Sequence, residues 1–436
     1  MPLQTVNGRA CRWAGASVKV LKMISVDEAQ RMILDRVPVL PTEIVALSET
    51  TGRILRQDIY ADMDMPPFDR ARMDGYALRA ADLAIVPARL RVLGQLAAGQ
   101  QFDGQVGPGQ AVRIMTGAPV PDGADAVQKV EATATDQQTV TIYESVKVGQ
   151  FITPRGSEAT RGQHLIAAGQ RITPADIAVM ATFGYAQVRV SQSLTVNVLS
   201  TGNELVEVNQ TPSIAQIRNS NGYALRSYLD QLGARSSFLG IVPDDEELIL
   251  QRIKAALPQC DVLILSGGVS MGDYDLVKHA LRRLGADIVF DRVCIHPGKP
   301  TVFALLEHKP VFALPGNPVS VAVTFLNFVY PALNKMMGAR DIFLPSFRAI
   351  LEADAKHAPD RRSYLPGRLT SREGQLTVAP LRWGGSSDLI AFRHANALII
   401  VPEGLSLIQA GQLCHTILIP HMSWASAAAK ESQPIR

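Results

Sequence analysis

The stretch LILSGGVSMGDYDLVKHAL, residues 263–281, contains the pattern that decides the fold. A short apolar run leads into Gly267 and Gly268, and a helical stretch follows Asp275. A buried strand, a glycine turn and a helix in this order are the repeating unit of α/β domains. The sequence therefore predicts that this stretch lies in an α/β domain.

The same alternation extends over residues 194–338. Apolar runs such as LTVNVLS, SSFLGIV and ADIVFDRV alternate with helical stretches such as NGYALRSYLDQLG and DEELILQRIKAAL. This spacing predicts a doubly wound parallel sheet with helices on both faces. Such sheets bind ligands beyond the carboxyl ends of their strands.

The rest of the chain follows other patterns, which predict a multi-domain protein of the α/β plus β class. Glycines and prolines separate short strands over residues 63–161, so we expect a β-rich lobe inserted between residues 23–62 and 162–193. Residues 339–424 predict a small C-terminal β-barrel domain without helices. Residues 1–22 are expected to form a disordered N-terminal extension.

The composition limits the classes of partner. With 436 residues, 47% of them hydrophobic and 19% charged, the chain is typical of a folded protein with several domains. Its net charge of +3 gives little attraction for a polyanion, so no nucleic-acid partner is expected. The four cysteines form no C-x-x-C pair, which argues against a disulfide framework or zinc knuckle and favours the cytoplasm.

Residues 310–333 are uncharged and long enough to span a bilayer. Pro310, Pro315, Gly316 and Pro318 interrupt this stretch. A buried strand, a turn and a buried helix therefore explain the pattern better than a membrane helix. No membrane span is expected.

Small and polar residues follow the predicted strands where a ligand would bind. The residues in question are Ser200, Thr201 and Gly202 after one strand and Ser266, Gly267, Gly268 and Ser270 after another. Backbone N–H groups in such loops can approach an anion closely. Two further turns contribute Lys299, Pro315 and Pro318. The sequence predicts a phosphorylated ligand at this edge of the sheet.

The acids near these loops have two interpretations. Glu204, Asp244, Asp273 and Asp275 could be solvated acids at helix starts, or they could hold Mg²⁺ against a phosphate. Because Glu204 and Asp275 lie at loop ends, we expect their removal to cost little stability.

Six ordered motifs add a resemblance to a known family. The strings are FDRARMDGYA, RIMTGAPVPDGADAV, STGNEL, SGGVSMGDYD, HPGKP and LPGNPVS. In this order they resemble the molybdopterin molybdenumtransferase family, which includes bacterial MoeA and the gephyrin E domain. The resemblance implies an enzyme that inserts molybdate into adenylylated molybdopterin and releases AMP with the help of Mg²⁺. It also implies a homodimer, with residues 23–62 and 162–193 as a linker and dimerisation domain.

The resemblance further implies roles for individual residues. Asp74 and Thr116 of the β-rich lobe are expected to complete the site of the partner subunit, and Asp244 and Lys299 are expected to act with them in catalysis. The candidates for the molybdate pocket are Arg292, His296, Lys299 and Ser386, with Arg361 as a weaker candidate. The candidate Mg²⁺ ligands are Glu204, Asp275 and Glu158.

Three positions depart from the family pattern. His296 stands where many relatives have lysine, Glu158 in RGSEAT stands where Gly-Glu-Asp is common, and Pro366 replaces the arginine usual before a glycine. A histidine at an anion site changes charge near neutral pH. We therefore expect molybdate affinity to weaken as the pH rises from about 6 to 8.

Other functions remain open from the sequence. A sibling molybdopterin adenylyltransferase would share the α/β domain but would have Thr-Gly-Gly-Thr-Gly where this chain has SGGVS. A nucleotide-hydrolysing relative of the competence-protein type would lack MDGYA. A dimeric scaffold or a molybdopterin carrier is the non-enzymatic alternative, and an adenylyltransferase is a possible partner.

Overall fold

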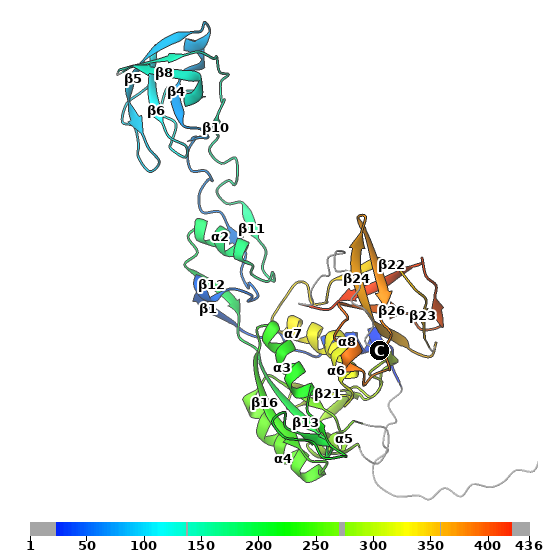
Figure 1. Cartoon of the computed structure of the whole chain (residues 1–436). Helices are drawn as coiled ribbons and strands as arrows, with labels where there is room; N and C mark the ends of the chain where they lie inside the picture. The colour runs from blue at the N-terminus through cyan, green and yellow to red at the C-terminus, as the bar shows by residue number, and fades with distance from the viewer. Residues whose placement is uncertain (1–22, 137, 270–274, 358, 421–436) are drawn as a thin grey trace, which may run out of the picture. The chain divides into compact units, whose positions relative to one another are not determined.

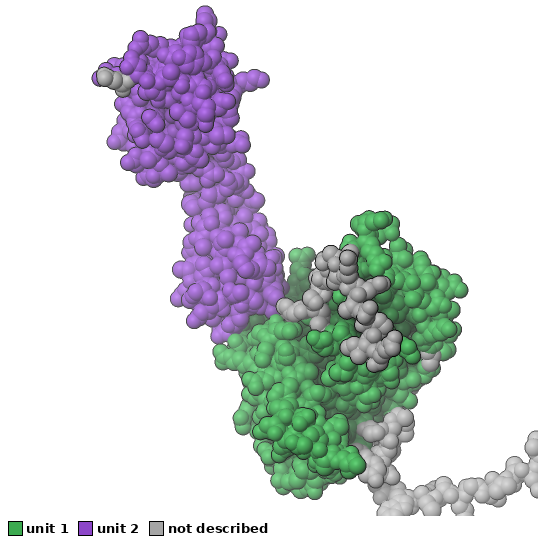
Figure 2. Space-filling view, viewed as in Figure 1, with its two compact units in different colours: residues 1–41, 191–436 green, residues 42–190 purple. Residues whose placement is uncertain are grey.

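The computed structural model describes residues 23–136, 138–269, 275–357 and 359–420. These residues form two compact units (Figure 2). One unit comprises the described residues of 1–41 and 191–436, and the other comprises residues 42–190. Residues 1–22 of the expected N-terminal extension lie outside the described residues.

The first unit is built on a six-stranded sheet in the order β16-β13-β17-β21-β20-β18. Its strands are β13 (Thr195–Thr201), β16 (Arg235–Val242), β17 (Val262–Ser266), β18 (Asp287–Phe290), β20 (Val302–Leu306) and β21 (Lys309–Leu314). The four strands from β16 to β21 pair in parallel, which brings their carboxyl ends to one edge.

The expected parallel sheet also contains β20, a strand that was not predicted and that pairs antiparallel with both of its neighbours. Glu307 and His308 join β20 to β21, and both have positive φ, 51° and 64°. Two consecutive residues with positive φ form the tight turn of a β-hairpin. Sequence reasoning missed this hairpin because Glu-His is not one of the pairs that favour such a turn.

Helices cover both faces of the sheet, as expected (Figure 1). The helices are α3 (Asn221–Gln231), α4 (Glu246–Ala256), α5 (Leu276–Arg283) and α6 (Pro318–Thr324). Ile249 of α4 and Leu281 of α5 belong to one buried cluster with Leu263 and Leu265 of β17. Alternate residues of a strand point to opposite faces, so α4 and α5 cover the face on which these leucines lie. Helices α3 and α6 lie on the other face (Figure 1).

The uncharged stretch 310–333 forms most of β21, helix α6 and part of a π-helical segment and helix α7, as expected. The π-helical segment spans Phe325–Val329, and α7 spans Tyr330–Met336. Within the described part of the chain, every helix is too short or too polar to cross a bilayer.

A closed β-barrel follows in the same unit. Its strands are β22 (Ser346–Leu351), β24 (Arg362–Arg372), β25 (Gln375–Pro380), β26 (Ala397–Val401) and β28 (Leu413–Leu418), and β24 closes the barrel by pairing with β26. Strand β19 (Ile295–His296) pairs in parallel with the start of β24, which places His296 beside Ser363. Short pairs in this unit are β14 (Leu205–Val206) with β15 (Ile217–Arg218) and β23 (Ala355–Lys356) with β27 (Leu407–Ile408). The expectation of no helix here is wrong for the short helix α8 (Leu389–Phe392).

The second unit contains the β-rich lobe, which confirms that part of the predicted fold class. Its six-stranded sheet has the order β7-β4-β6-β5-β9-β8. The strands are β4 (Gly75–Leu78), β5 (Ala88–Leu96), β6 (Gln110–Ile114), β7 (Ala126–Lys129), β8 (Thr133–Asp136) and β9 (Thr139–Ile142). The rest of this unit holds helix α2 (Pro174–Thr182) and the pairs β1 (Thr42–Ala46) with β12 (Gln187–Ser191), β2 (Ile59–Tyr60) with β11 (His164–Ile166), and β3 (Arg70–Ala71) with β10 (Ile152–Thr153).

Helix α1 (Val26–Leu34) packs in the first unit, although the predicted division groups it with residues 23–62. Gln30 Nε2 donates a hydrogen bond to the Asn327 carbonyl over 3.0 Å. Arg362 of the barrel donates two hydrogen bonds to the Asp27 carboxylate, over 2.6 and 2.8 Å. Helix α1 therefore links the α/β part of the unit to the barrel.

Candidate active site

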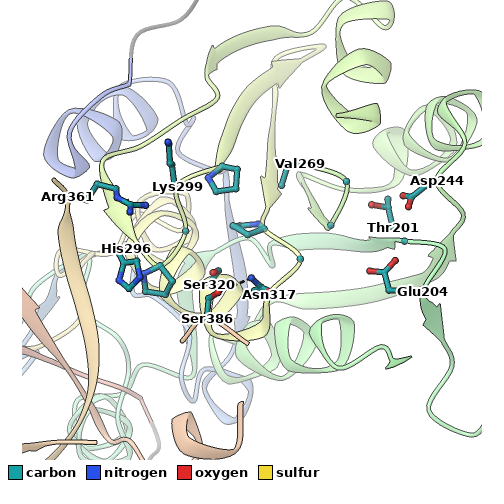
Figure 3. A pocket seen from close by; sticks show the side chains of 18 residues that line it. Thr201, Glu204, Asp244, Val269, His296, Lys299, Asn317, Ser320, Arg361 and Ser386 are labelled. Carbon is teal, nitrogen blue, oxygen red and sulfur yellow. Dashed lines mark hydrogen bonds between the residues drawn. The ribbon is translucent and has the colours of Figure 1, made fainter. Parts of the chain in front are cut away.

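A cavity of about 470 Å³ lies at the carboxyl ends of β13, β17 and β21 (Figure 3). The predicted site residues that line it are Thr201, Gly202, Glu204, Asp244, Gly267, Gly268, His296, Lys299, Pro315, Arg361 and Ser386. The others that line it are Val269, Pro297, Gly298, Pro300, Gly316, Asn317 and Ser320. Parallel pairing explains this convergence, because residues distant in sequence follow strands that end at the same edge.

Two glycines let the loop after β17 approach the end of β13. Gly267 and Gly268 have φ of 95° and 65°, a region that side chains rarely tolerate. A Cβ on Gly267 would lie 2.3 Å from the Thr201 carbonyl oxygen, and one on Gly268 would lie 2.7 Å from Thr201 Oγ1. The two loops can therefore meet only without these side chains.

Thr201 gives the cavity a polar group that lacks a partner, beside Glu204 and Asp244 (Figure 3). The residue is 2% exposed, and its hydroxyl has no hydrogen-bond partner among the described residues. A buried hydroxyl without a partner is unfavourable, by about 1–3 kcal/mol. A ligand with oxygen atoms would satisfy it.

Two carboxylates form the acidic end of the cavity, Glu204 and Asp244 (Figure 3). The Asn203 N–H donates to Asp244 Oδ2 over 3.3 Å, and the Asp244 N–H donates to Asn203 Oδ1 over 3.0 Å. These reciprocal bonds hold the loops after β13 and β16 together. Neither carboxylate forms an ion pair with a cationic side chain in the described part of the chain.

The opposite end is cationic and is formed by Lys299, Arg361 and His296 (Figure 3). Arg361 Nε donates to Asp360 Oδ2 over 2.9 Å, which fixes the guanidinium and offsets part of its charge. Ser386 is also fixed, because its hydroxyl oxygen accepts a hydrogen bond of 2.8 Å from Asn317 Nδ2.

His296 is half-buried between this end and the barrel. Its Nδ1 lies 3.2 Å from the hydroxyl oxygen of Ser363. Burial, assisted by the nearby Arg361 and His357, lowers the pKa of His296 below its usual value, with Asp360 acting in the opposite direction. The imidazole is therefore mostly neutral at pH 7.

Several predicted residues lie beside the cavity without lining it. Ser200 and Ser266 are buried, and each shares a hydrogen bond with an asparagine, Ser200 Oγ with Asn219 Oδ1 over 3.2 Å and Ser266 Oγ with Asn221 Nδ2 over 3.0 Å. These bonds support the strand ends. Pro318 is the first residue of α6, and the Arg292 carbonyl accepts from the Ile24 N–H over 3.4 Å. Ser270 and Asp273 lie outside the described residues.

Asp275 is buried beneath the loop and does not line the cavity. It is 4% exposed, caps α5 and forms an ion pair with Lys278, whose Nζ also lies 3.2 Å from Asp291 Oδ2. We expected that Asp275 could be removed at little cost in stability because it lies at a loop end. The structure shows that this premise is wrong, since Asp275 is buried. Its role as a metal ligand stays a prediction.

Asp74 and Thr116 lie together in the second unit. The backbone N–H and the hydroxyl of Thr116 both donate to Asp74 Oδ1 over 2.7 Å. These two bonds lower the pKa of the exposed Asp74 carboxyl. Glu158, in the same unit, forms an ion pair of 2.8 Å with Arg70.

The acidic end fits Mg²⁺ if a substrate supplies further oxygens. No three acidic, histidine or cysteine residues in the described ranges are grouped so as to hold a metal by themselves. Mg²⁺ in phosphate-processing sites is commonly held by one or two carboxylates together with substrate phosphates. Glu204 and Asp244 supply such a pair.

Sequence reasoning missed His357 and Ser363, which lie behind His296. Their contact with His296 depends on the pairing of β19 with β24, which are far apart in the chain. It also did not assign Asn317 and Ser320 to the site, although both lie in LPGNPVS, where a polar turn precedes a helix. That turn was the available signal.

Comparisons with known proteins agree with this architecture. Residues 24–184 match the MoeA N-terminal region (domain I and II), residues 197–335 a probable molybdopterin binding domain, and residues 348–419 the MoeA C-terminal region (domain IV). A molybdopterin molybdenumtransferase from Staphylococcus aureus (strain MSSA476) is 35% identical over 399 residues, 91% of this chain and 95% of the relative. This chain belongs to the molybdopterin molybdenumtransferase family.

Further members of the molybdopterin molybdenumtransferase family extend the match. One from Staphylococcus epidermidis (strain ATCC 35984) is 35% identical over 406 residues, 92% of this chain and 97% of the relative. The crystal structure of a molybdopterin biosynthesis MoeA protein from Pyrococcus horikosii is 31% identical, with a TM-score of 0.77, over 91% of this chain and 99% of that protein. The predicted family, fold class and enzyme class are confirmed.

Proposed function

We propose that this molybdenumtransferase inserts molybdate into adenylylated molybdopterin and releases AMP. The supporting observation is one cavity with an acidic end, Glu204 and Asp244, and a cationic end, Lys299, Arg361 and His296. A substrate with a phosphoanhydride needs a metal ion at its phosphates, and an oxyanion needs positive charge. The cavity offers each at a separate end.

The phosphates of the substrate would lie along Thr201 and the loop of Gly267 and Gly268. The unpartnered Thr201 hydroxyl supports this placement, because it lies beside Glu204 and Asp244, where the metal would hold the phosphates (Figure 3). Glu204 and Asp244 would hold Mg²⁺ together with phosphate oxygens. When bound, the ion would neutralise phosphate charge and polarise the phosphoanhydride that is cleaved.

Molybdate would bind at the cationic end. Lys299 would act as a point charge, and Arg361 would offer hydrogen bonds in a fixed direction because Asp360 restrains it. The predicted role of Arg292 would be indirect, because it does not line the cavity.

We further propose a homodimer in the cytoplasm, with Asp74 and Thr116 of one subunit acting at the cavity of the other. Thr116 holds the exposed Asp74 carboxylate and lowers its pKa, so the carboxylate stays ionised. An exposed, ionised and fixed carboxylate suits a group that contacts a ligand bound in the cavity of the other subunit. The free thiols Cys260, Cys294 and Cys414 are consistent with a reducing compartment.

The activity is tested by incubating the purified chain with adenylylated molybdopterin, molybdate and Mg²⁺ and measuring AMP. AMP should appear only when all three are present, and removal of the metal with a chelator should stop it. A folded chain that binds the substrate and releases no AMP would instead favour a carrier or scaffold.

The shared site is tested by mixing two inactive variants, Asp74→Ala and Glu204→Ala. If subunits share sites, heterodimers contain one site with both residues intact, and part of the activity should return. Each variant mixed with itself is the control. No recovery after verified subunit exchange would place the whole site within one chain.

A further inference from the structure

The β-rich lobe contains a cavity of its own, which the proposed function leaves unused. This cavity measures about 480 Å³ and lies wholly within the second unit. Its apolar lining residues are Phe68, Phe102, Pro119, Val120 and Pro121, and its polar ones are Gln100, Gln101 and Asp122. Pockets of this size with an apolar, aromatic lining and a few polar groups are typical of small-molecule sites.

The Phe102 ring lies against backbone that carries no side chains. A Cβ on Gly104 would lie 2.8 Å from Phe102 Cε1, and one on Gly94 would lie 3.8 Å from Phe102 Cε2. The same ring packs against a buried cluster that includes Val106. These contacts fix Phe102, whereas Phe68 is 38% exposed and open to a ligand. A flat heterocycle can therefore gain stacking contacts here.

Gln100 and Asp122 give the cavity a hydrogen-bond donor and an acceptor. Gln100 Oε1 accepts a hydrogen bond from the Ala97 N–H over 3.1 Å, so the Nε2 group of this amide remains as a donor. Asp122 is exposed, and its carboxylate forms no ion pair with a described residue. Both groups are available to a ligand.

This combination matches the polar edge of a pterin. That edge presents two N–H groups, at the 2-amino group and at N3, and an acceptor at the 4-oxo group. A carboxylate can accept from both N–H groups, and an amide N–H can donate to the oxygen. A pterin would therefore satisfy Asp122 and Gln100 while its ring stacks on a phenylalanine.

The substrate of the proposed function carries such a ring, and the first unit offers it little to stack on. Among the described residues that line the cavity of the first unit, none is Phe, Tyr or Trp. That cavity has polar and charged groups for phosphates and an oxyanion. The aromatic cavity of the lobe supplies what the first unit lacks.

The cavity of the lobe lies close to Thr116. A Cβ on Gly117, the next residue, would lie 3.8 Å from Ala98 Cβ, at the start of the loop that holds Gln100. Residues 119–122 continue the same RIMTGAPVPDGADAV motif and line the cavity. A ligand that reaches Thr116 therefore lies near the entrance to both loops.

We propose that this cavity binds the pterin of adenylylated molybdopterin, with Phe68 and Phe102 stacking on the ring and Asp122 and Gln100 recognising its polar edge. The inference rests on the shared site of the proposed function, in which the lobe acts at the cavity of the other subunit. One substrate molecule then has its phosphates bound by one subunit and its pterin by the other.

Pterins fluoresce, so a fluorescence titration of 6-hydroxymethylpterin with the full chain measures binding directly. Phe68→Leu keeps an apolar side chain but removes the stacking ring, and affinity should fall about tenfold. Asp122→Asn removes the charged acceptor and should also weaken binding about tenfold. The controls are Tyr143→Leu and Asp136→Asn, two exposed residues of the lobe that do not line the cavity and should leave affinity unchanged.

Lumazine, which has an oxygen in place of the 2-amino group, separates recognition of the edge from structural support. The wild type should bind lumazine about tenfold more weakly than the pterin, because the carboxylate meets an oxygen. Asp122→Asn should remove this preference. A loss of affinity that is equal for both ligands would mean that Asp122 only supports the lobe, and would overturn its assigned role.

AMP release by the full chain provides the second measurement. Phe68→Leu and Asp122→Asn should raise KM for adenylylated molybdopterin about tenfold, whereas the affinity for AMP alone, which has no pterin, should not change. The pocket is overturned if the wild type binds no pterin, or if both variants bind it as the wild type does. Normal AMP release without pterin binding would remove only this inference. Pterin binding that both variants weaken, without AMP release, would instead remove the proposed function and leave the pterin pocket standing.

Discussion

The acidic and cationic ends of the cavity are built on opposite plans. At the acidic end, Glu204 and Asp244 are exposed and have no cationic partner among the described residues. At the cationic end, Arg361 is held by Asp360, His296 by Ser363, and Ser386 by Asn317. The acidic end therefore needs a ligand to complete it. The cationic end is already ordered before any ligand binds, and its charge is partly offset.

The largest effect is expected on stability, at Lys278, which belongs to neither end of the cavity. This side chain is buried and pairs with Asp275 and Asp291. Lys278→Met would leave two buried carboxylates without a cation, which should lower the free energy of unfolding by about 3–5 kcal/mol. Urea denaturation measures this, with the exposed Lys254→Met as control.

The Lys278 variant tests whether Asp275, its partner in an ion pair, has a structural role or belongs to the acidic end of the cavity. If Asp275 is structural, Asp275→Asn should keep its Mg²⁺ dependence of AMP release, since Glu204 and Asp244 remain. Unchanged stability in Lys278→Met, or loss of Mg²⁺ dependence in Asp275→Asn, would return Asp275 to the metal ligands.

The acidic end itself is tested by the double variant Glu204→Gln, Asp244→Asn. Without these charges the metal is lost, and AMP release should fall about 10²–10³-fold, the usual effect of removing a group that stabilises developing charge. Molybdate affinity, measured by calorimetry, should stay within about threefold, because the two ends are separate. Asp287→Asn, at an exposed site on β18, is the control. A parallel loss of molybdate binding would contradict the division into two ends.

The cationic end is tested by His296→Lys. Burial and Arg361 lower the pKa of His296, so its charged form predominates only below a pH that is itself lower than the usual 6.5, and it is lost as the pH rises. Wild-type molybdate affinity should therefore fall from pH 6 to pH 8, by up to about 100-fold for one coupled proton. The lysine keeps its charge, so its affinity should be nearly constant over this range. Equal pH profiles would make His296 part of the scaffold only.

The sequence predicts much of the cavity because its loops follow strands. Thr201, Gly202, Gly267 and Gly268 could be identified since parallel strand ends converge whatever the details of packing. The burial of Asp275 could not, because it depends on Lys278 and Asp291, which only the fold brings together.

The cationic end was less predictable for the same reason. The His296 contact with Ser363 requires the chain to leave the α/β sheet after β18 and pair with the barrel through β19. Two-residue strands carry no periodic signal, and the register of a distant pair is a tertiary property. The hairpin of β20 and β21 was missed because its turn, Glu307 and His308, lacks the usual glycine or asparagine.

The smallest effect on stability and binding is expected at Thr201, which lies beside Glu204 and Asp244 (Figure 3). Thr201→Val removes a buried hydroxyl that has no partner among the described residues, so stability should change by less than about 1 kcal/mol or should rise. Binding of AMP should weaken only about three- to tenfold, corresponding to one lost hydrogen bond to a phosphate or ribose oxygen. Thermal melting and AMP titration measure the two quantities, with Thr195→Val at the other end of β13 as control. A clear loss of stability with unchanged AMP affinity would mean that the hydroxyl supports the Gly267 loop and does not contact the nucleotide.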